Sequence, residues 1–253
     1  QYVPALLGRA RQRLSSGTPD VEGAFADIGL AEQVDSANSS IKPLKAQAYA
    51  KQATVLFRAG KITDSERSLK EAEALGAAES DVSESRASLA EVYVKQAEAA
   101  VIRSDVAGIR AACDSAERYQ ATSADLNRLR AAAFKAEGEQ KKKFGDLSGA
   151  VAALEEAVKL DSSLTTELAV LHIKVGEQAA AKQDYQTAAT ELDAAVTLDS
   201  SLGLTTAVRR HARHSGIAFP PMPEQIQVRE SSDNPATAAG SAKTANRQTT
   251  ASA

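Results

Sequence analysis

The second half of the chain repeats itself, and this repeat limits the possible folds more than any other feature. The segment Leu-Asp-Ser-Ser-Leu occurs at residues 160–164 and again at residues 198–202, which is 38 residues later. Upstream, Leu154 and Ala157 correspond in the same register to Leu192 and Ala195. A fixed period in this range is typical of a solenoid, in which each repeat is a helix pair that buries its apolar face against its neighbours.

Proline placement supports a helical chain. Residues 44–219 contain no proline, whereas Pro4, Pro19 and Pro43 precede this stretch and the other four prolines follow it. Proline inside a helix costs about 3 kcal/mol, so a long stretch without it favours helices. No run alternates Val, Ile, Thr or aromatic residues with polar ones between turn signals, so strands are not expected. The predicted fold class is all-α.

Composition excludes several classes of protein. The 253 residues are 43% hydrophobic and 25% charged, which is typical of a soluble globular protein. The net charge of −3 provides no global attraction for nucleic acid or membrane. No apolar run approaches the roughly 18 residues that span a bilayer. The single cysteine, Cys113, excludes an internal disulfide and a cysteine-based zinc site. We expect a soluble protein and favour the cytoplasm over export.

The repeated residues form a motif that runs from a turn, through a helix, to a closing alanine. The two best copies are Gly145-Asp146-Leu147 leading to Ala157 and Leu160-Asp161, and Gln183-Asp184-Tyr185 leading to Ala195 and Leu198-Asp199. In these residues the chain resembles the tetratricopeptide repeat (TPR) family, most strongly over about residues 124–202. The resemblance implies that Gly138 and Gly176, which stand where the family has a small residue, mark the closest approach of the two helices of a pair. The resemblance implies a right-handed superhelical solenoid.

Carried over the whole chain, this frame predicts about five antiparallel helix pairs. The expected pairs cover residues 4–34, 44–75, 82–119, 124–160 and 164–198, and they close on Ala31, Ala72, Ala116, Ala157 and Ala195. A C-terminal capping helix over 202–214 would cover the end of the stack. Residues 1–43 are expected to form a degenerate first pair, 44–216 the TPR-like repeats with the capping helix, and 217–253 a Pro-containing, Ala/Ser/Thr-rich disordered tail.

Polar residues mark several expected helix starts. Thr18 before Pro19 provides a capping hydroxyl, and Thr63 with Glu66 has the spacing of a capping box. The Asp-Ser-Ser runs at 161–163 and 199–201 are expected to cap the helices that follow them.

The resemblance also implies a binding surface. In this family, first-helix residues that avoid the core line a concave groove, which binds a peptide or a helix of a partner. The corresponding positions here are Gln47, Thr54, Phe57, Glu91, Val94, Glu98, Lys135, Glu139, Lys142, Ile173 and Glu177. Glu98, Glu139 and Glu177 would form an acidic row along this groove. A solvated charged face without a ligand is the alternative interpretation of such a row.

The sequence offers no catalytic, cofactor-binding or metal-binding set. His172 occupies the place of Tyr49 and Tyr93 in earlier repeats, facing the partner helix, which predicts a packed side chain. His211 and His214 lie one turn apart, but no Glu, Asp or Cys close by in the sequence would complete a metal site. No Gly-rich phosphate-binding loop is present. We therefore expect no enzymatic activity and no cofactor.

The expected function is a non-catalytic scaffold for protein–protein interaction, with another protein or a peptide segment as the partner. We expect no membrane span and no small-molecule substrate. Two alternatives remain open. The chain begins with Gln1 and not with Met, so it is alternatively the regulatory TPR arm of a larger enzyme or signalling protein, such as a kinase, cut before Gln1. The other alternative is contact with phosphate or nucleic acid through the basic run at 209–214.

Overall fold

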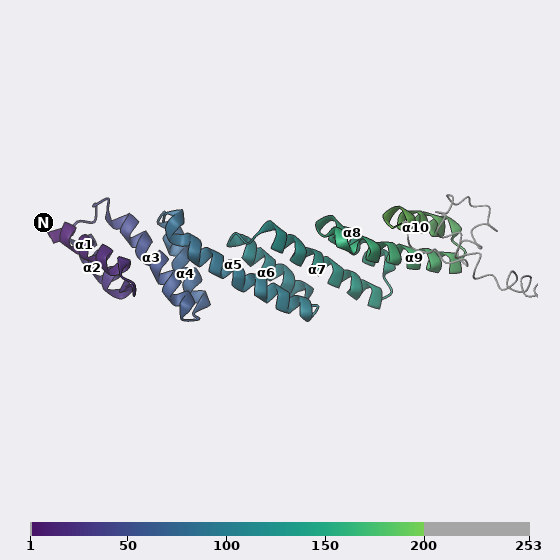
Figure 1. The fold of residues 1–253 in the computed structure, drawn as a ribbon, viewed down its shortest axis with the longest axis horizontal. Helices are drawn as coiled ribbons and strands as arrows, with labels where there is room; N and C mark the ends of the chain where they lie inside the picture. The colour runs from purple at the N-terminus through teal and green to yellow at the C-terminus, as the bar shows by residue number, and fades with distance from the viewer. Residues whose placement is uncertain (1, 200–253) are drawn as a thin grey trace, which may run out of the picture. The chain divides into compact units, whose positions relative to one another are not determined.

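The computed structural model of the chain describes residues 2–199. Over these residues it is all-α: ten α-helices and one short 3-10 helix, with no strand (Figure 1). The helices are α1 Tyr2–Ser15, α2 Val21–Val34, α3 Ile41–Arg58, α4 Ile62–Ala74, α5 Glu79–Ile102, α6 Val106–Arg118, α7 Ser123–Lys143, α8 Leu147–Leu160, α9 Thr165–Ala181 and α10 Tyr185–Leu198, with the 3-10 helix at Ser162–Leu164. The expected capping helix and tail, and the basic run at 209–214, lie outside the described residues.

Successive helices form pairs, as the sequence predicted. The most extensive contacts join α1 to α2, α3 to α4, α5 to α6, and α9 to α10. The helix bounds agree with the five expected pairs to within three residues. The chain divides into two compact units, one up to Arg130 and one from Ala131, so the division falls within α7.

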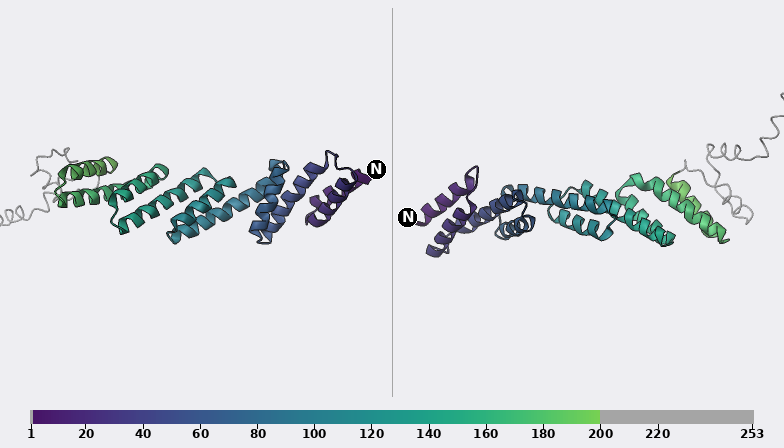
Figure 2. Two further views of the ribbon diagram at one scale, coloured as in Figure 1. Left: turned by 180° about the vertical axis from the view of Figure 1, so that it is seen from behind. Right: turned by 90° about the horizontal axis from the view of Figure 1, so that it is seen from below.

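In the first unit, helices of successive pairs also contact one another. The first helix of each pair packs on the first helix of the next, α1 on α3 and α3 on α5. The second helices α2 and α4 each pack on the first helix of the following pair (Figures 1 and 2). In the second unit, α8 packs on α9. The first unit therefore has a layer made of first helices, and this layer holds the candidate site.

The same turn joins the helices inside four of the pairs. Gly60, Ser104, Gly145 and Gln183 each follow a first helix and have a positive φ, between 54° and 80°. The next residue then donates its backbone N–H to a carbonyl five residues earlier, as Asp105 does to Ala100 at 3.0 Å. This is the Schellman geometry that ends many helices. It reverses the chain within a few residues and so brings the second helix back along the first.

An aspartate begins most of the second helices. Asp20, Asp105, Asp146 and Asp184 each accept a hydrogen bond from the backbone N–H three residues ahead, at 2.8–3.1 Å. This side chain satisfies one of the free N–H groups at a helix start. The remaining second helix, α4, has Lys61 at this place and no side-chain cap.

Two of the expected helix starts are wrong. Helix α2 is capped by Asp20, two residues after Thr18, because the Asp20 carboxylate reaches the Gly23 N–H. Thr63 lies inside the first turn of α4 and is not its N-cap. The expected cap at Asp161 is confirmed, since its carboxylate accepts from the Ser163 N–H at the start of the 3-10 helix before α9.

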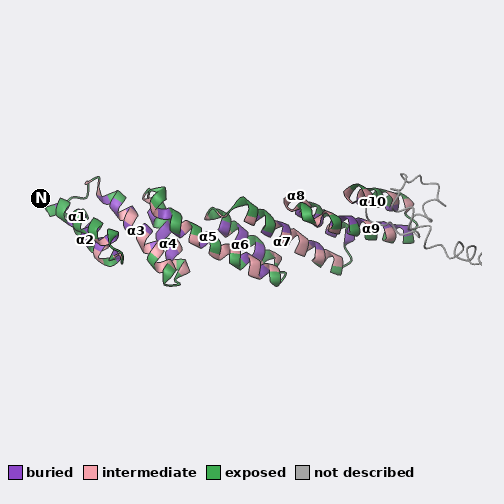
Figure 3. Cartoon of the chain, in the orientation of Figure 1, coloured by how far each residue is buried: buried purple, intermediate pink, exposed green. Residues whose placement is uncertain are grey.

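Small residues form much of the core, and they allow close packing of the helices. All five predicted closing alanines are fully buried: Ala31, Ala72, Ala116, Ala157 and Ala195. A Cβ atom added at Gly138 would lie 3.3 Å from the Ala150 carbonyl oxygen, and one added at Gly176 would lie 3.3 Å from that of Ala188. These contacts are tight, so the two glycines mark close helix approaches, as predicted. Most helices bury one side and expose another, whereas α3 is buried or half-buried around most of its surface (Figure 3).

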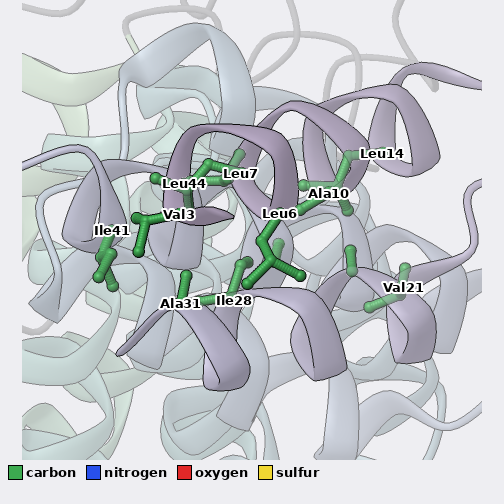
Figure 4. Packing of buried hydrophobic residues seen from close by; sticks show 12 residues of the cluster. Val3, Leu6, Leu7, Ala10, Leu14, Val21, Ile28, Ala31, Ile41 and Leu44 are labelled. Atoms are coloured by element: carbon green, nitrogen blue, oxygen red, sulfur yellow. The ribbon is translucent and has the colours of Figure 1, made fainter. Parts of the chain in front are cut away.

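The first pair, which matches the repeat only weakly in sequence, has an apolar core of its own. Leucine, valine and isoleucine side chains of α1, α2 and the start of α3 pack together there (Figure 4). Leu6 and Leu7 of α1, for example, lie between Ile28 of α2 and Leu44 of α3. Asp27 is buried in the same pair and accepts hydrogen bonds from Arg9. Arg13 lies 3.5 Å from the same carboxylate. The Arg9 hydrogen bond holds the pKa of Asp27 below its usual range.

Candidate functional site

An open cleft of about 330 Å³ lies on the layer of first helices in the first unit. Helix α1 and the turn after it form one wall, α3 forms the floor, and the first turns of α5 form the other wall. Five residues of α3 form the floor: Gln47, Lys51, Thr54, Val55 and Arg58. Thr54 and Val55 are adjacent in sequence, and the other steps are of three or four residues. Such spacing places them on one face of α3.

The charges of the cleft are distributed unevenly between its walls. Arg11 on α1 and Lys51 on α3 line it, and neither forms an ion pair within residues 2–199. Arg58 pairs with Glu84 of α5 at 2.7 Å, and both side chains remain exposed. Asp81 of α5 also lines the cleft without an ion pair in the described chain. The cleft is therefore positive over α1 and α3, and negative at α5.

The neutral groups of the cleft differ in how they are bonded. The Thr54 hydroxyl donates to the Ala50 carbonyl and shares a 2.8 Å hydrogen bond with the buried Ser85 of α5. That bond fixes α3 to α5 at the bottom of the cleft. The Gln47 side-chain amide, by contrast, has no hydrogen bond to any described residue. Val55 is 41% exposed, so the floor also presents an apolar side chain to solvent.

These groups can bind a ligand through ion pairs, amide hydrogen bonds and an apolar contact. The residues that line the cleft include no histidine and no cysteine. Over residues 2–199, no three His, Cys, Asp or Glu side chains gather closely enough to hold a metal ion.

Of the predicted groove residues in the first unit, Gln47 and Thr54 line this cleft and the others do not. Phe57 packs against the apolar cluster of α3, α4 and α5. Glu91 pairs with Lys95 at 2.6 Å, and Glu98 pairs with Arg128 at 2.8 Å. Val94 is half-buried.

Most of the predicted groove residues of the second unit already form ion pairs or apolar contacts with neighbouring residues. Lys135 pairs with Glu167 at the start of α9, and Lys142 donates to Glu139 at 2.6 Å. Ile173 packs against the cluster that contains Leu192. Glu177 is half-buried and has no ion pair with a described residue. The acidic row is thus divided between the two units, and two of its three carboxylates are neutralised by Arg128 and Lys142.

The two residues with potential reactivity are packed. His172 is 7% exposed, and its Nδ1 lies 2.7 Å from Glu191 of the partner helix, as its place in the repeat predicted. Cys113 is buried in α6, and this burial raises the pKa of its thiol. A thiol that stays protonated is a poor nucleophile, so Cys113 acts as a small apolar residue.

Sequence reasoning missed one polar cluster. The hydroxyls of Tyr93 and Tyr119 both donate to the Glu66 carboxylate, and the two rings stack with centroids 5.8 Å apart. Burial and the adjacent carboxylate raise the pKa of each tyrosine to about 12, so both remain donors. The cluster ties α4, α5 and α6 together and lies outside the cleft. No repeat motif indicates it, because the three residues are far apart in sequence.

Comparison with protein-family models, with curated proteins and with solved structures gives no significant match. None of the helices within residues 2–199 is both long enough and apolar enough to pass through a membrane.

Proposed function

We propose that this chain is a non-catalytic, protein-binding scaffold of the TPR type, a right-handed solenoid that holds a segment of a partner protein against its first helices. The observation that carries the proposal is the cleft over α1, α3 and α5. It is open, it is made by three successive first helices, and it contains Gln47, Arg11 and Lys51 without partners in the described chain. Unpartnered polar groups on a rigid surface are available to a ligand.

The cleft is organised before any ligand arrives. Its floor and walls are helices whose buried sides pack into the core, and the Thr54–Ser85 hydrogen bond holds α3 against α5. A ligand that binds there orders only itself and a few side chains. Preorganisation of this kind reduces the entropic cost of association, because little of the protein has to change shape.

An extended ligand suits the cleft better than a helical one. The Gln47 amide offers both donors and an acceptor, and these match the N–H and C=O groups of a peptide backbone. A helical ligand has its backbone groups bonded internally and would offer Gln47 only side chains. An extended segment leaves its backbone groups free, and it can place a small apolar side chain over Val55.

A selection experiment with a matched pair of variants tests this function. Random 12-residue peptides displayed on phage are selected on the full chain, and enriched sequences are synthesised with a fluorescent label for anisotropy titration. Val55→Arg places a long charged side chain in the cleft, so we expect at least about tenfold weaker binding. Val34→Arg makes the same change at an exposed position of α2 outside the cleft and should leave the affinity unchanged.

Both valines are exposed, so neither substitution should alter folding. Far-UV circular dichroism and the melting temperature are expected to match those of the parent chain for both variants. Equal affinity of Val55→Arg and Val34→Arg for every enriched peptide would show that peptides bind elsewhere. A selection that enriches no peptide would contradict the scaffold itself.

A further inference from the structure

The uneven charge of the cleft indicates which charges a bound peptide would carry. Arg11 on α1 and Lys51 on α3 line the cleft without counter-ions in the described chain, and Asp81 on α5 lines it in the same condition. Arg58 of α3 and Glu84 of α5 neutralise each other. Lys51 and Asp81 are half-buried, so solvent screens their interactions with a ligand less than it would screen fully exposed charges.

A ligand of a single charge sign fits this cleft poorly. A polyanion such as nucleic acid would be attracted by Arg11 and Lys51 but repelled by Asp81. A polybasic segment would be attracted by Asp81 but repelled by Arg11 and Lys51. Like charges placed together at an interface act as selection against the wrong partner. The charge pattern instead complements a ligand that carries both signs in a defined order.

Helix geometry gives the separation between the two charges. Packed helices lie about 8–10 Å apart, so the region between α1 and α3 is about 12–15 Å from α5. An extended peptide advances about 3.3 Å per residue. The two complementary side chains would therefore stand about three to five residues apart, with the intervening residues over α3.

We propose that the cleft selects an extended peptide segment with an acidic residue over Arg11 and Lys51 and, three to five residues away, a basic residue over Asp81. A small apolar side chain between them contacts Val55, and the peptide backbone bonds to Gln47. This inference rests on the proposed scaffold function and adds the chemical class of the partner segment.

The phage selection provides the first readout, and charge reversal provides the second. Enriched 12-residue peptides should contain an acidic and a basic residue at the stated spacing more often than the unselected library does. The double variant Arg11→Glu/Lys51→Glu should bind a labelled enriched peptide at least about tenfold more weakly, because two attractions become repulsions. The same peptide with its acidic residue changed to Lys should recover binding to the double variant.

Asp81→Lys provides an independent arm on the α5 wall of the cleft. We expect weaker binding of the parent peptide, and recovery when the basic residue of the peptide is changed to Glu. Lys70→Glu on α4 and Glu22→Lys on α2 are the matched controls, since both residues are exposed, lie outside the cleft and form no ion pair within residues 2–199. Neither control should change the affinity.

The outcomes separate this inference from the scaffold function. Enriched peptides that lose affinity to Val55→Arg, yet show no charge pattern and bind the charge-reversed variants unchanged, would overturn the inference and leave the scaffold function standing. Loss of affinity without recovery by the charge-swapped peptides would also overturn it, because the substitutions would then act on the protein alone. Enrichment of polyacidic peptides that bind Asp81→Lys as tightly as the parent chain, or more tightly, would overturn the inference and assign the site to a plain anion. A selection that enriches nothing would overturn both proposals.

Discussion

The turns inside the helix pairs allow a quantitative test of the repeat. Gly60, Ser104, Gly145 and Gln183 occupy the same place, with φ of 73°, 54°, 80° and 67°. An L-residue in this left-handed region costs about 1–2 kcal/mol, whereas glycine avoids that cost but loses about 0.5–1 kcal/mol more in chain entropy on folding. The balance favours glycine by about 0.5–1 kcal/mol. We therefore expect Ser104→Gly and Gln183→Gly each to raise the free energy of unfolding by that amount.

The two native glycines provide the reciprocal test. A Cβ atom added at Gly60 or Gly145 meets no other atom within 4 Å, so an alanine there would test the backbone conformation alone. Gly60→Ala and Gly145→Ala should each lower the free energy of unfolding by about 1 kcal/mol. Ser104 and Gln183 are exposed and form no side-chain hydrogen bond within the described residues, so their replacement removes no contact.

Thermal unfolding followed by far-UV circular dichroism measures these changes, and hydrogen exchange in the flanking helices localises them. For a chain of this size about 1 kcal/mol shifts the melting temperature by roughly 2–4 °C, so shifts of about 1–4 °C are expected. Gly8→Ala is the control: Gly8 lies exposed inside α1 with open space around it, so alanine should stabilise that helix. If Ser104→Gly destabilises the protein, or Gly145→Ala stabilises it, the common turn geometry is wrong.

Two further predictions concern buried side chains. Asp27→Asn should lower stability at pH 7 by about 1.5–3 kcal/mol, the range for hydrogen bonds to charged groups. Because the folded-state pKa of Asp27 is depressed, its contribution is present above the unfolded pKa of about 3.9 and is lost as pH falls through the folded value. Urea unfolding between pH 7 and pH 3 should show the gap between parent and variant closing, and a constant gap would contradict the assignment. Leu154→Ala and Leu192→Ala, at equivalent buried places in α8 and α10, should each cost about 2–5 kcal/mol in urea unfolding; losses below about 1 kcal/mol for both would mean a shifted repeat frame.

The helix pairs could be predicted because the residues that define them act locally. A fully buried alanine such as Ala157 or Ala195 is needed wherever two helices approach closely, so the same small residue recurs at each copy. A capping group at the start of a second helix satisfies a free backbone N–H, and aspartate fills that role at Asp105, Asp146 and Asp184. These demands depend on neighbours within one pair, and the sequence repeats them.

The residues of the first pair follow the repeat less regularly than those of the later pairs, and the pair still has an apolar core. Its closing Ala31 and its cap Asp20 do fit the pattern of the later pairs. The spacing from Asp20 to Gly23 is that of Asp105 to Gly108 and Asp146 to Gly149, and this spacing would have favoured Asp20 over Thr18 as the cap. A side chain three residues before a free N–H is better placed than a hydroxyl two residues further back.

The sequence does not show which of the predicted groove residues already have ion-pair partners, and the physical reason is the reach of their side chains. Long charged side chains reach several partners, and the nearest one in sequence is not always the one they bind. Lys135 reaches across to Glu167 of α9, although Glu139 lies one turn along its own helix, and Glu139 in turn binds Lys142. Residues that face a cleft carry no packing demand, so no repeat in the sequence reports which of them remain unpartnered.

In the first unit, most of the positions that line the cleft differ from the positions that pack the core. Ala50 and Ala53 are fully buried on α3, whereas Gln47 and Lys51 lie on the face of the same helix that lines the cleft. Thr54 belongs to both groups, because its hydroxyl bonds to Ser85 while its side chain borders the cleft. A change at Gln47 or Lys51 alters what the cleft can bind at little cost to packing, and a change at Thr54 would loosen α3 from α5. Substitutions at such positions can thus alter the charge pattern of the cleft while the helix pairs beneath it stay the same.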